Sequence, residues 1–117
     1  MNPISTIAGL RAAVGAGAWL APNLSGRLFG LDPDANPQAS YLGRLFGIRD
    51  IALAAGTLGS EGEARRKWVQ LGLVCDVADA AAAYLGGRNG TLPKPAAVMT
   101  GVTALVAAGM GLAAMNE

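Results

Sequence analysis

The chain divides into four apolar segments separated by short polar connections. The clearest segment, Ala96 to Met115, has twenty residues without a charged side chain, and such a stretch predicts a membrane-spanning helix. The other segments cover about residues 4–22, 40–59 and 68–86 and contain one to three charged residues each. We therefore expect four helices, at about residues 4–22, 38–59, 67–86 and 95–115.

These helices predict an all-α fold that occupies residues 1–117 as a single domain. Short connections between helices favour antiparallel neighbours, so we expect an integral membrane four-helix bundle with up-down topology and short loops. A soluble, alanine-rich four-helix bundle is the main alternative, and it requires a polar face on every helix. The last segment has only Thr100 and Thr103 as polar side chains, which favours the membrane.

A cleaved signal peptide is a second alternative for the first segment. Ala16, Gly17 and Ala18 resemble a small-residue cleavage site. No lysine or arginine precedes Arg11, although signal peptides begin with a basic region. The pattern therefore favours a retained helix.

The composition supports a tightly packed helical protein in lipid. Apolar residues make up 52% of the chain and charged residues 15%, against about 25% charged in a typical soluble domain. The chain contains 24 alanines and 17 glycines, and small residues allow helices in a membrane to approach closely. Spacings such as Gly43-x-x-x-Gly47 place these residues on one helix face.

The residue types also exclude several kinds of chemistry. The absence of histidine excludes haem, histidine-type zinc sites and Ser-His or Cys-His nucleophiles. Cys75 is the only cysteine, so an internal disulfide and a cysteine metal cluster are excluded. The net charge is +1 and no basic stripe with interleaved aromatics occurs, so we expect no nucleic-acid binding, no metal and no cofactor.

The most informative feature is a layer of charges near the middle of three segments. These residues are Arg11 in the first segment, Arg49 and Asp50 in the second, and Asp76 and Asp79 in the third. Asp76 and Asp79 are three residues apart and share a helix face. Charges in the bilayer centre cost about 2.5–3.5 kcal/mol each when they face lipid, so we expect these groups to meet one another or a cavity.

Several functions fit such a polar site. In an enzyme acting on a lipophilic small molecule, Asp76 and Asp79 would be general acid and base, Arg49 would hold an anionic group, and Asp50 would orient Arg49. The polar core would include Arg11. The alternatives are a binding site for a lipophilic ligand, an accessory or structural subunit of a larger membrane complex, a proton-coupled small transporter, and an ion-pair network that only fixes helix register.

The excess of three acids over two arginines predicts a shared proton. Like charges one helical turn apart raise one pKa, so the sequence places this proton on the pair of Asp76 and Asp79.

One stretch resembles a known family. Tyr41-Leu42-Gly43-Arg44-Leu45-Phe46-Gly47-Ile48-Arg49-Asp50, with Trp19-Leu20-Ala21-Pro22 upstream, resembles a family of small bacterial membrane proteins with four predicted helices and no established activity. The resemblance covers roughly the first 60 residues. It implies a four-helix membrane fold and draws attention to the Gly-Ile-Arg-Asp motif.

These features predict a multi-pass protein of the bacterial plasma membrane. The expected partners are the lipid bilayer, a lipophilic ligand, partner membrane helices or a second copy of the chain. Basic residues gather on the cytoplasmic side of membrane proteins, and the triplet Arg65-Arg66-Lys67 therefore predicts that both termini are cytoplasmic.

Overall fold

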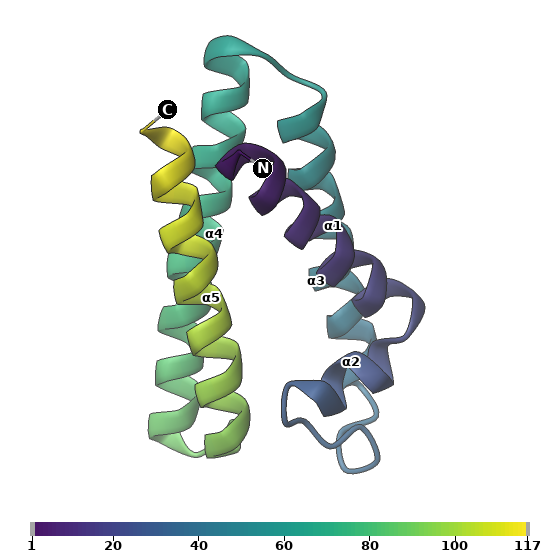
Figure 1. The fold of residues 1–117 in the computed structure, drawn as a ribbon. Coiled ribbons are helices and arrows are strands. Elements are labelled where there is room, and N and C mark those ends of the chain that lie inside the picture. The colour runs from purple at the N-terminus through teal and green to yellow at the C-terminus, as the bar shows by residue number, and fades with distance from the viewer. Residues whose placement is uncertain (1, 117) are drawn as a thin grey trace.

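The computed structural model describes residues 2–116, and these residues form five helices joined by turns (Figure 1). The helices are α1 (Pro3–Leu20), α2 (Pro22–Leu28), α3 (Ala39–Leu58), α4 (Gly62–Asn89) and α5 (Lys94–Met115). The molecule measures 44 × 28 × 20 Å. Helix α1 begins and α5 ends toward the same end of the molecule (Figure 1).

The prediction of a four-helix integral membrane bundle is wrong. The described residues form five helices, and only α4 and α5 are long and apolar enough to cross a membrane. Helix α3 has three charged residues among its 20, and charges are the costliest groups to insert. Helix α1 has only 18 residues, and its composition includes serine, threonine and three glycines. The sequence analysis therefore overestimated how well the segments that form α1 and α3 could cross a membrane.

Proline and glycine decide where the helices begin and end. The predicted helix over residues 4–22 stops at Leu20, because Pro22 disfavours a helical conformation in the residue before it. Ala21 has φ −136° and ψ 66°, and Pro22 begins the separate helix α2. Helix α4 ends at Gly90, whose φ of +81° is readily adopted by glycine. Pro95 lies in the first turn of α5, where its missing N–H costs nothing.

The four long helices form two closely packed pairs. Helices α1 and α3 pack extensively, as do α4 and α5, whereas α3–α4 and α1–α5 share much smaller contacts. The first pair crosses at Gly15 and Gly47: a Cβ added to either would lie 2.6 Å from the carbonyl oxygen of the other. Glycine at both positions therefore sets the separation of α1 and α3.

Two further contacts join the helix pairs at opposite ends. Near the α3–α4 connection, the indole ring of Trp68 lies where a Cβ on Gly56 would be. At the other end, Gly30 has φ +85° and lies against the backbone of Ala96, which is fully buried. The connection after α2 thus covers the start of α5.

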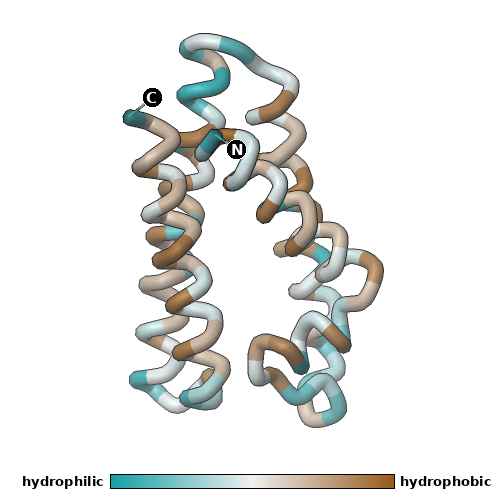
Figure 2. Tube along the Cα trace, in the orientation of Figure 1, coloured by the Kyte–Doolittle hydropathy of each residue, from teal (hydrophilic) through white to brown (hydrophobic). Residues whose placement is uncertain are grey.

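The distribution of side chains is the reverse of that in a typical soluble domain. The buried apolar residues are mostly alanines, and no large side chain of the described residues is fully buried. Large apolar side chains instead lie on the outside, such as Leu105, which is 62% exposed in the middle of α5. In Figure 2, hydrophilic residues gather in the α3–α4 connection and in the turn between α4 and α5, while the long helices are mostly pale to brown.

Candidate functional site

The five charged residues predicted to meet lie together as one chain of alternating charges. In spatial order the residues are Asp79, Arg49, Asp50, Arg11 and Asp76. Helices α1, α3 and α4 each contribute at least one of them. The chain of charges therefore connects the α1–α3 pair to the α4–α5 pair, where the helices themselves have few contacts.

The two outer links are bidentate ion pairs. Arg11 donates from Nη1 to Asp76 Oδ1 at 3.0 Å and from Nη2 to Oδ2 at 2.6 Å. Arg49 forms the same fork with Asp79, at 3.1 and 2.6 Å. Paired hydrogen bonds between guanidinium and carboxylate are among the strongest polar contacts in proteins. Arg11 of α1 and Arg49 of α3 therefore each anchor one acid of α4.

The third acid lies between the two arginines. Asp50 Oδ1 is 4.0 Å from Arg11 Nη1 and 3.9 Å from Arg49 Nη2, and the Asp50 side chain is 7% exposed. Neither distance is within hydrogen-bonding range. Asp50 is thus held by charge attraction to both arginines.

Burial differs along the chain of charges. The side chains of Arg11 and Asp76 are 8% and 5% exposed, whereas those of Arg49 and Asp79 are 36% and 32% exposed. The Arg49 guanidinium also lies 4.7 Å from the centre of the Phe46 ring, in the range of a cation–π contact. One end of the cluster is sealed, and the other reaches the molecular surface between α3 and α4.

A glycine makes room for the sealed end. A Cβ on Gly72 of α4 would lie 2.6 Å from Arg11 Nη2, so a larger residue there would push the guanidinium away from that helix. Sequence reasoning assigned no role to Phe46, and it placed Gly72 only as a small residue on the helix face of Asp76 and Asp79. The spacing of Gly72 and Asp76, four residues apart on one helix face, is the signal that could have identified this cradle.

The charge count and burial together identify Asp50 as the acid that can exchange a proton. Burial lowers the pKa of the Arg11 and Arg49 guanidiniums, but their hydrogen-bonded acids more than compensate, so both pKa values are raised and both groups stay charged. Burial raises the pKa of the Asp50 carboxyl to about 6, despite the attraction of Arg11 and Arg49. A protonated Asp50 leaves two arginines facing two carboxylates.

The expectation that Asp76 and Asp79 share the proton differs from this arrangement. Although one turn apart, the two side chains bind different arginines. The assigned roles of Asp76, Asp79, Arg49 and Asp50 in catalysis stay predictions.

The Asp50→Asn variant should show the pH dependence that this raised pKa implies. Between about pH 4 and pH 6 the folded wild type keeps a proton that the unfolded chain has lost, so its stability falls as the pH rises through this window. Asparagine imitates the protonated acid at every pH. The free energy of unfolding of the variant, relative to wild type, should therefore increase from pH 4.5 to pH 7.5.

Thermal unfolding in a mild detergent, followed by circular dichroism at both pH values, measures this difference. Asp34→Asn is the control, because the Asp34 side chain is 88% exposed. If the free energy of unfolding of Asp50→Asn differs from that of wild type by the same amount at both pH values, the pKa of Asp50 is not raised by folding.

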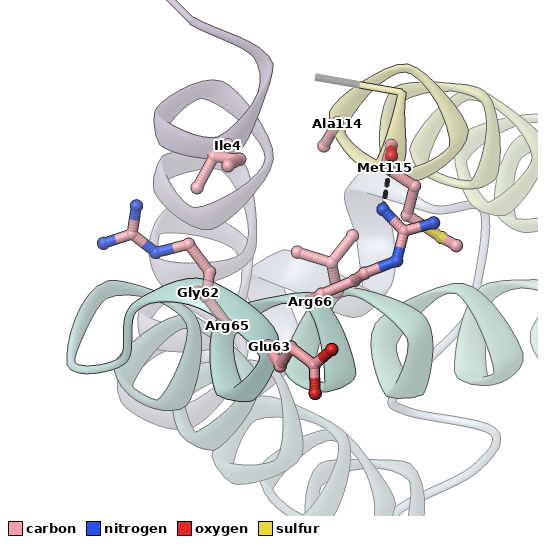
Figure 3. Close-up of a pocket in the computed structure, with 8 residues that line it drawn as sticks. Ile4, Gly62, Glu63, Arg65, Arg66, Ala114 and Met115 are labelled. Carbon is pink, nitrogen blue, oxygen red and sulfur yellow. Dashed lines mark hydrogen bonds between the residues drawn. The ribbon is translucent and has the colours of Figure 1, made fainter.

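A hollow on the surface lies away from the chain of charges formed by Asp79, Arg49, Asp50, Arg11 and Asp76. A cavity of about 300 Å³ at the end where α1 and α4 begin and α5 ends is lined by residues that include Ile4, Arg65, Arg66 and Met115 (Figure 3). Arg66 Nη1 donates to the Met115 carbonyl oxygen at 2.7 Å across it, so this arginine caps α5. Within residues 2–116 no group of His, Cys, Asp or Glu side chains could hold a metal ion.

Comparisons with protein-family models, curated proteins and solved structures found no match to this chain. The resemblance to small bacterial membrane proteins therefore stays a prediction.

Proposed function

We propose that this chain is a membrane-associated accessory protein whose α4–α5 hairpin inserts into the lipid bilayer. The observation that supports this most is the outward placement of large apolar side chains over a core of alanine, glycine and charged residues. In the most apolar 18-residue stretch of each helix, only 22% of the residues of α4 and 28% of those of α5 are buried within the molecule. A core helix of a soluble protein would be mostly buried, and large exposed apolar surfaces mark membrane or partner contacts.

The dimensions of the hairpin fit this proposal. Helices of 28 and 22 residues are about 42 and 33 Å long, and the hydrocarbon layer is about 30 Å thick. The end of the hairpin that carries Arg65, Arg66 and Lys67 would face the cytoplasm of a bacterial cell, by the positive-inside rule. Helices α1 and α3 would pack against the hairpin, and the Arg11–Asp76 and Arg49–Asp79 ion pairs would hold them there.

An accessory role fits the charged cluster better than a sealed catalytic centre does. Each outer acid is already bound by an arginine in a bidentate pair, and the hollow at the end of the molecule is lined by other residues. In this role the ion pairs act as a clamp between helices, and the exposed apolar faces dock partner helices.

A charge placed in the middle of α5 tests the proposal. Leu105 is 62% exposed on the outer face of α5, so Leu105→Lys changes no buried contact. In a bilayer centre the lysine costs about 2.5–3.5 kcal/mol, and we expect the fraction of protein that floats with liposomes to fall sharply. Leu20→Lys, at a 79% exposed position at the end of α1, is the matched control and should float like wild type.

Flotation of purified protein with phosphatidylcholine and phosphatidylglycerol vesicles, followed by alkaline carbonate washing, provides the measurement. A folded wild-type protein that stays in the aqueous fraction would overturn the proposal. So would a Leu105→Lys variant that floats and resists washing as wild type does.

A second candidate function is acid–base chemistry on, or binding of, a lipophilic small molecule. The observation that favours it is the position of Asp50, a buried acid between two arginines, next to an ion pair that reaches the surface. A titrating carboxyl near neutral pH is the group that proton transfer requires. The Asp50→Asn comparison described above is the first test, because this function fails if Asp50 does not titrate.

A further inference from the structure

The exposed end of the charged chain, the Arg49–Asp79 ion pair, lies beside apolar side chains of α3. Leu42, Leu45 and Phe46 precede Arg49 by seven, four and three residues, so all four share one face of α3. The three apolar side chains are 61%, 47% and 37% exposed. On α3, therefore, the half-exposed Arg49 continues a stripe of large apolar side chains.

The neighbouring face of α4 has the opposite character. Ala82 and Gly86 follow Asp79 by three and seven residues and lie on the same helix face. Ala82 is exposed, whereas Gly86 is half-buried against Leu92 of the turn that follows α4. The large side chains of α3 and the small, exposed Ala82 of α4 therefore flank one ion pair, and they complement each other in size.

We propose that this face, defined by Leu42, Leu45, Phe46 and Arg49 of α3 with Asp79 and Ala82 of α4, joins two copies of the chain. The inference rests on the proposed membrane location. In water an ion pair that is one-third exposed is hydrated, whereas in hydrocarbon it needs a polar cover. The α4 helix that carries Asp79 is one of the two candidate spans.

The charges favour a second copy of this chain as the cover. Each copy presents one cation beside one anion. A two-fold axis through the face brings Arg49 of each copy next to Asp79 of the other, so that four charges alternate in a closed ring. The same axis brings the apolar stripe on α3 of one copy against Ala82 on α4 of the other, and small residues favour close packing of membrane helices.

Single-molecule photobleaching of the full chain, labelled at its N-terminus and diluted into phosphatidylcholine vesicles, tests the proposal. Wild type should bleach in two steps. The Arg49→Met/Asp79→Met variant removes both charges of the pair together and should bleach mainly in one step. Its matched control is Arg27→Met/Asp34→Met, which removes an ion pair that is 55% and 88% exposed and should bleach in two steps.

A steric variant keeps the test independent of the charges. Ala82→Trp places a large side chain at an exposed position on the proposed face, so it should block pairing while the monomer still folds. Ala113→Trp, at an exposed position of α5, should pair like wild type. Circular dichroism checks the fold of each variant.

Two outcomes would overturn the inference: one-step bleaching of wild-type protein, or two-step bleaching of both Ala82→Trp and the Arg49→Met/Asp79→Met variant. Flotation of the same samples separates this from the proposed function. Protein that floats as a monomer removes only the dimer, whereas protein that does not float removes the membrane location as well.

Discussion

Replacing Arg11 by alanine is expected to lower the free energy of unfolding by about 3–5 kcal/mol, because it leaves a buried charge without its partner. The Arg11 and Asp76 side chains are 8% and 5% exposed and share two hydrogen bonds. After the substitution, Arg49 alone faces three carboxyls. The Gly72 cradle also loses the guanidinium that fills it.

The effect should be reversed in large part by removing the other charge. In Arg11→Met/Asp76→Met, two apolar side chains replace the ion pair, and such exchanges are often neutral or stabilising. Chemical denaturation in detergent micelles, followed by tryptophan fluorescence and circular dichroism, gives the free energies of all variants. A double variant as unstable as Arg11→Ala would show that the ion pair contributes more than charge compensation.

Arg27→Ala is the control for the loss of an arginine. Arg27 and Asp34 form a surface pair at 3.7 Å, with side chains 55% and 88% exposed. Exposed pairs contribute about 0–1 kcal/mol, so this variant should unfold almost like wild type. A similar loss of stability in Arg11→Ala and Arg27→Ala would contradict the buried clamp.

Replacing Gly47 by alanine is expected to destabilise the protein by about 1–3 kcal/mol through overpacking at the α1–α3 crossing. The added Cβ would lie 2.6 Å from the Gly15 carbonyl oxygen and 3.0 Å from the Trp19 backbone nitrogen. Both atoms belong to the backbone of α1, so the helices must separate. Separation would also move Asp50, three residues further along α3, away from Arg11.

Replacing Gly9 by alanine, in contrast, is not expected to lower the free energy of unfolding. A Cβ on Gly9 meets no atom within 4 Å, and alanine is favoured over glycine in a helix by about 0.5–1 kcal/mol. Gly9→Ala should therefore be neutral or stabilising in the same denaturation experiment. Loss of stability in Gly9→Ala equal to that in Gly47→Ala would mean that helix packing does not depend on the Gly15–Gly47 contact.

The count of charges predicted that one acid in this layer is in excess, but it did not identify that acid as Asp50. The sequence contains three acids and two arginines in this layer, and this ratio predicts one proton to be shared. The helix spacing alone placed the proton on Asp76 and Asp79, because it reports neighbours on one helix only. The structure pairs each of these acids with an arginine from another helix, which leaves Asp50 as the acid in excess. Contacts between helices depend on crossing geometry, which spacing along one helix does not contain.

The sequence by itself determined where the backbone turns and what the helix surfaces are made of. Pro22, Pro95 and Gly90 act through local backbone constraints, so their effects can be recognised without a partner helix. Only the tertiary structure decided that α1 and α3 cross at Gly15 and Gly47 and that Arg11 and Arg49 bind different acids of α4. The reason is physical: in a chain this rich in alanine and glycine, many helix faces can pack closely, and the choice among them depends on contacts between residues far apart in sequence.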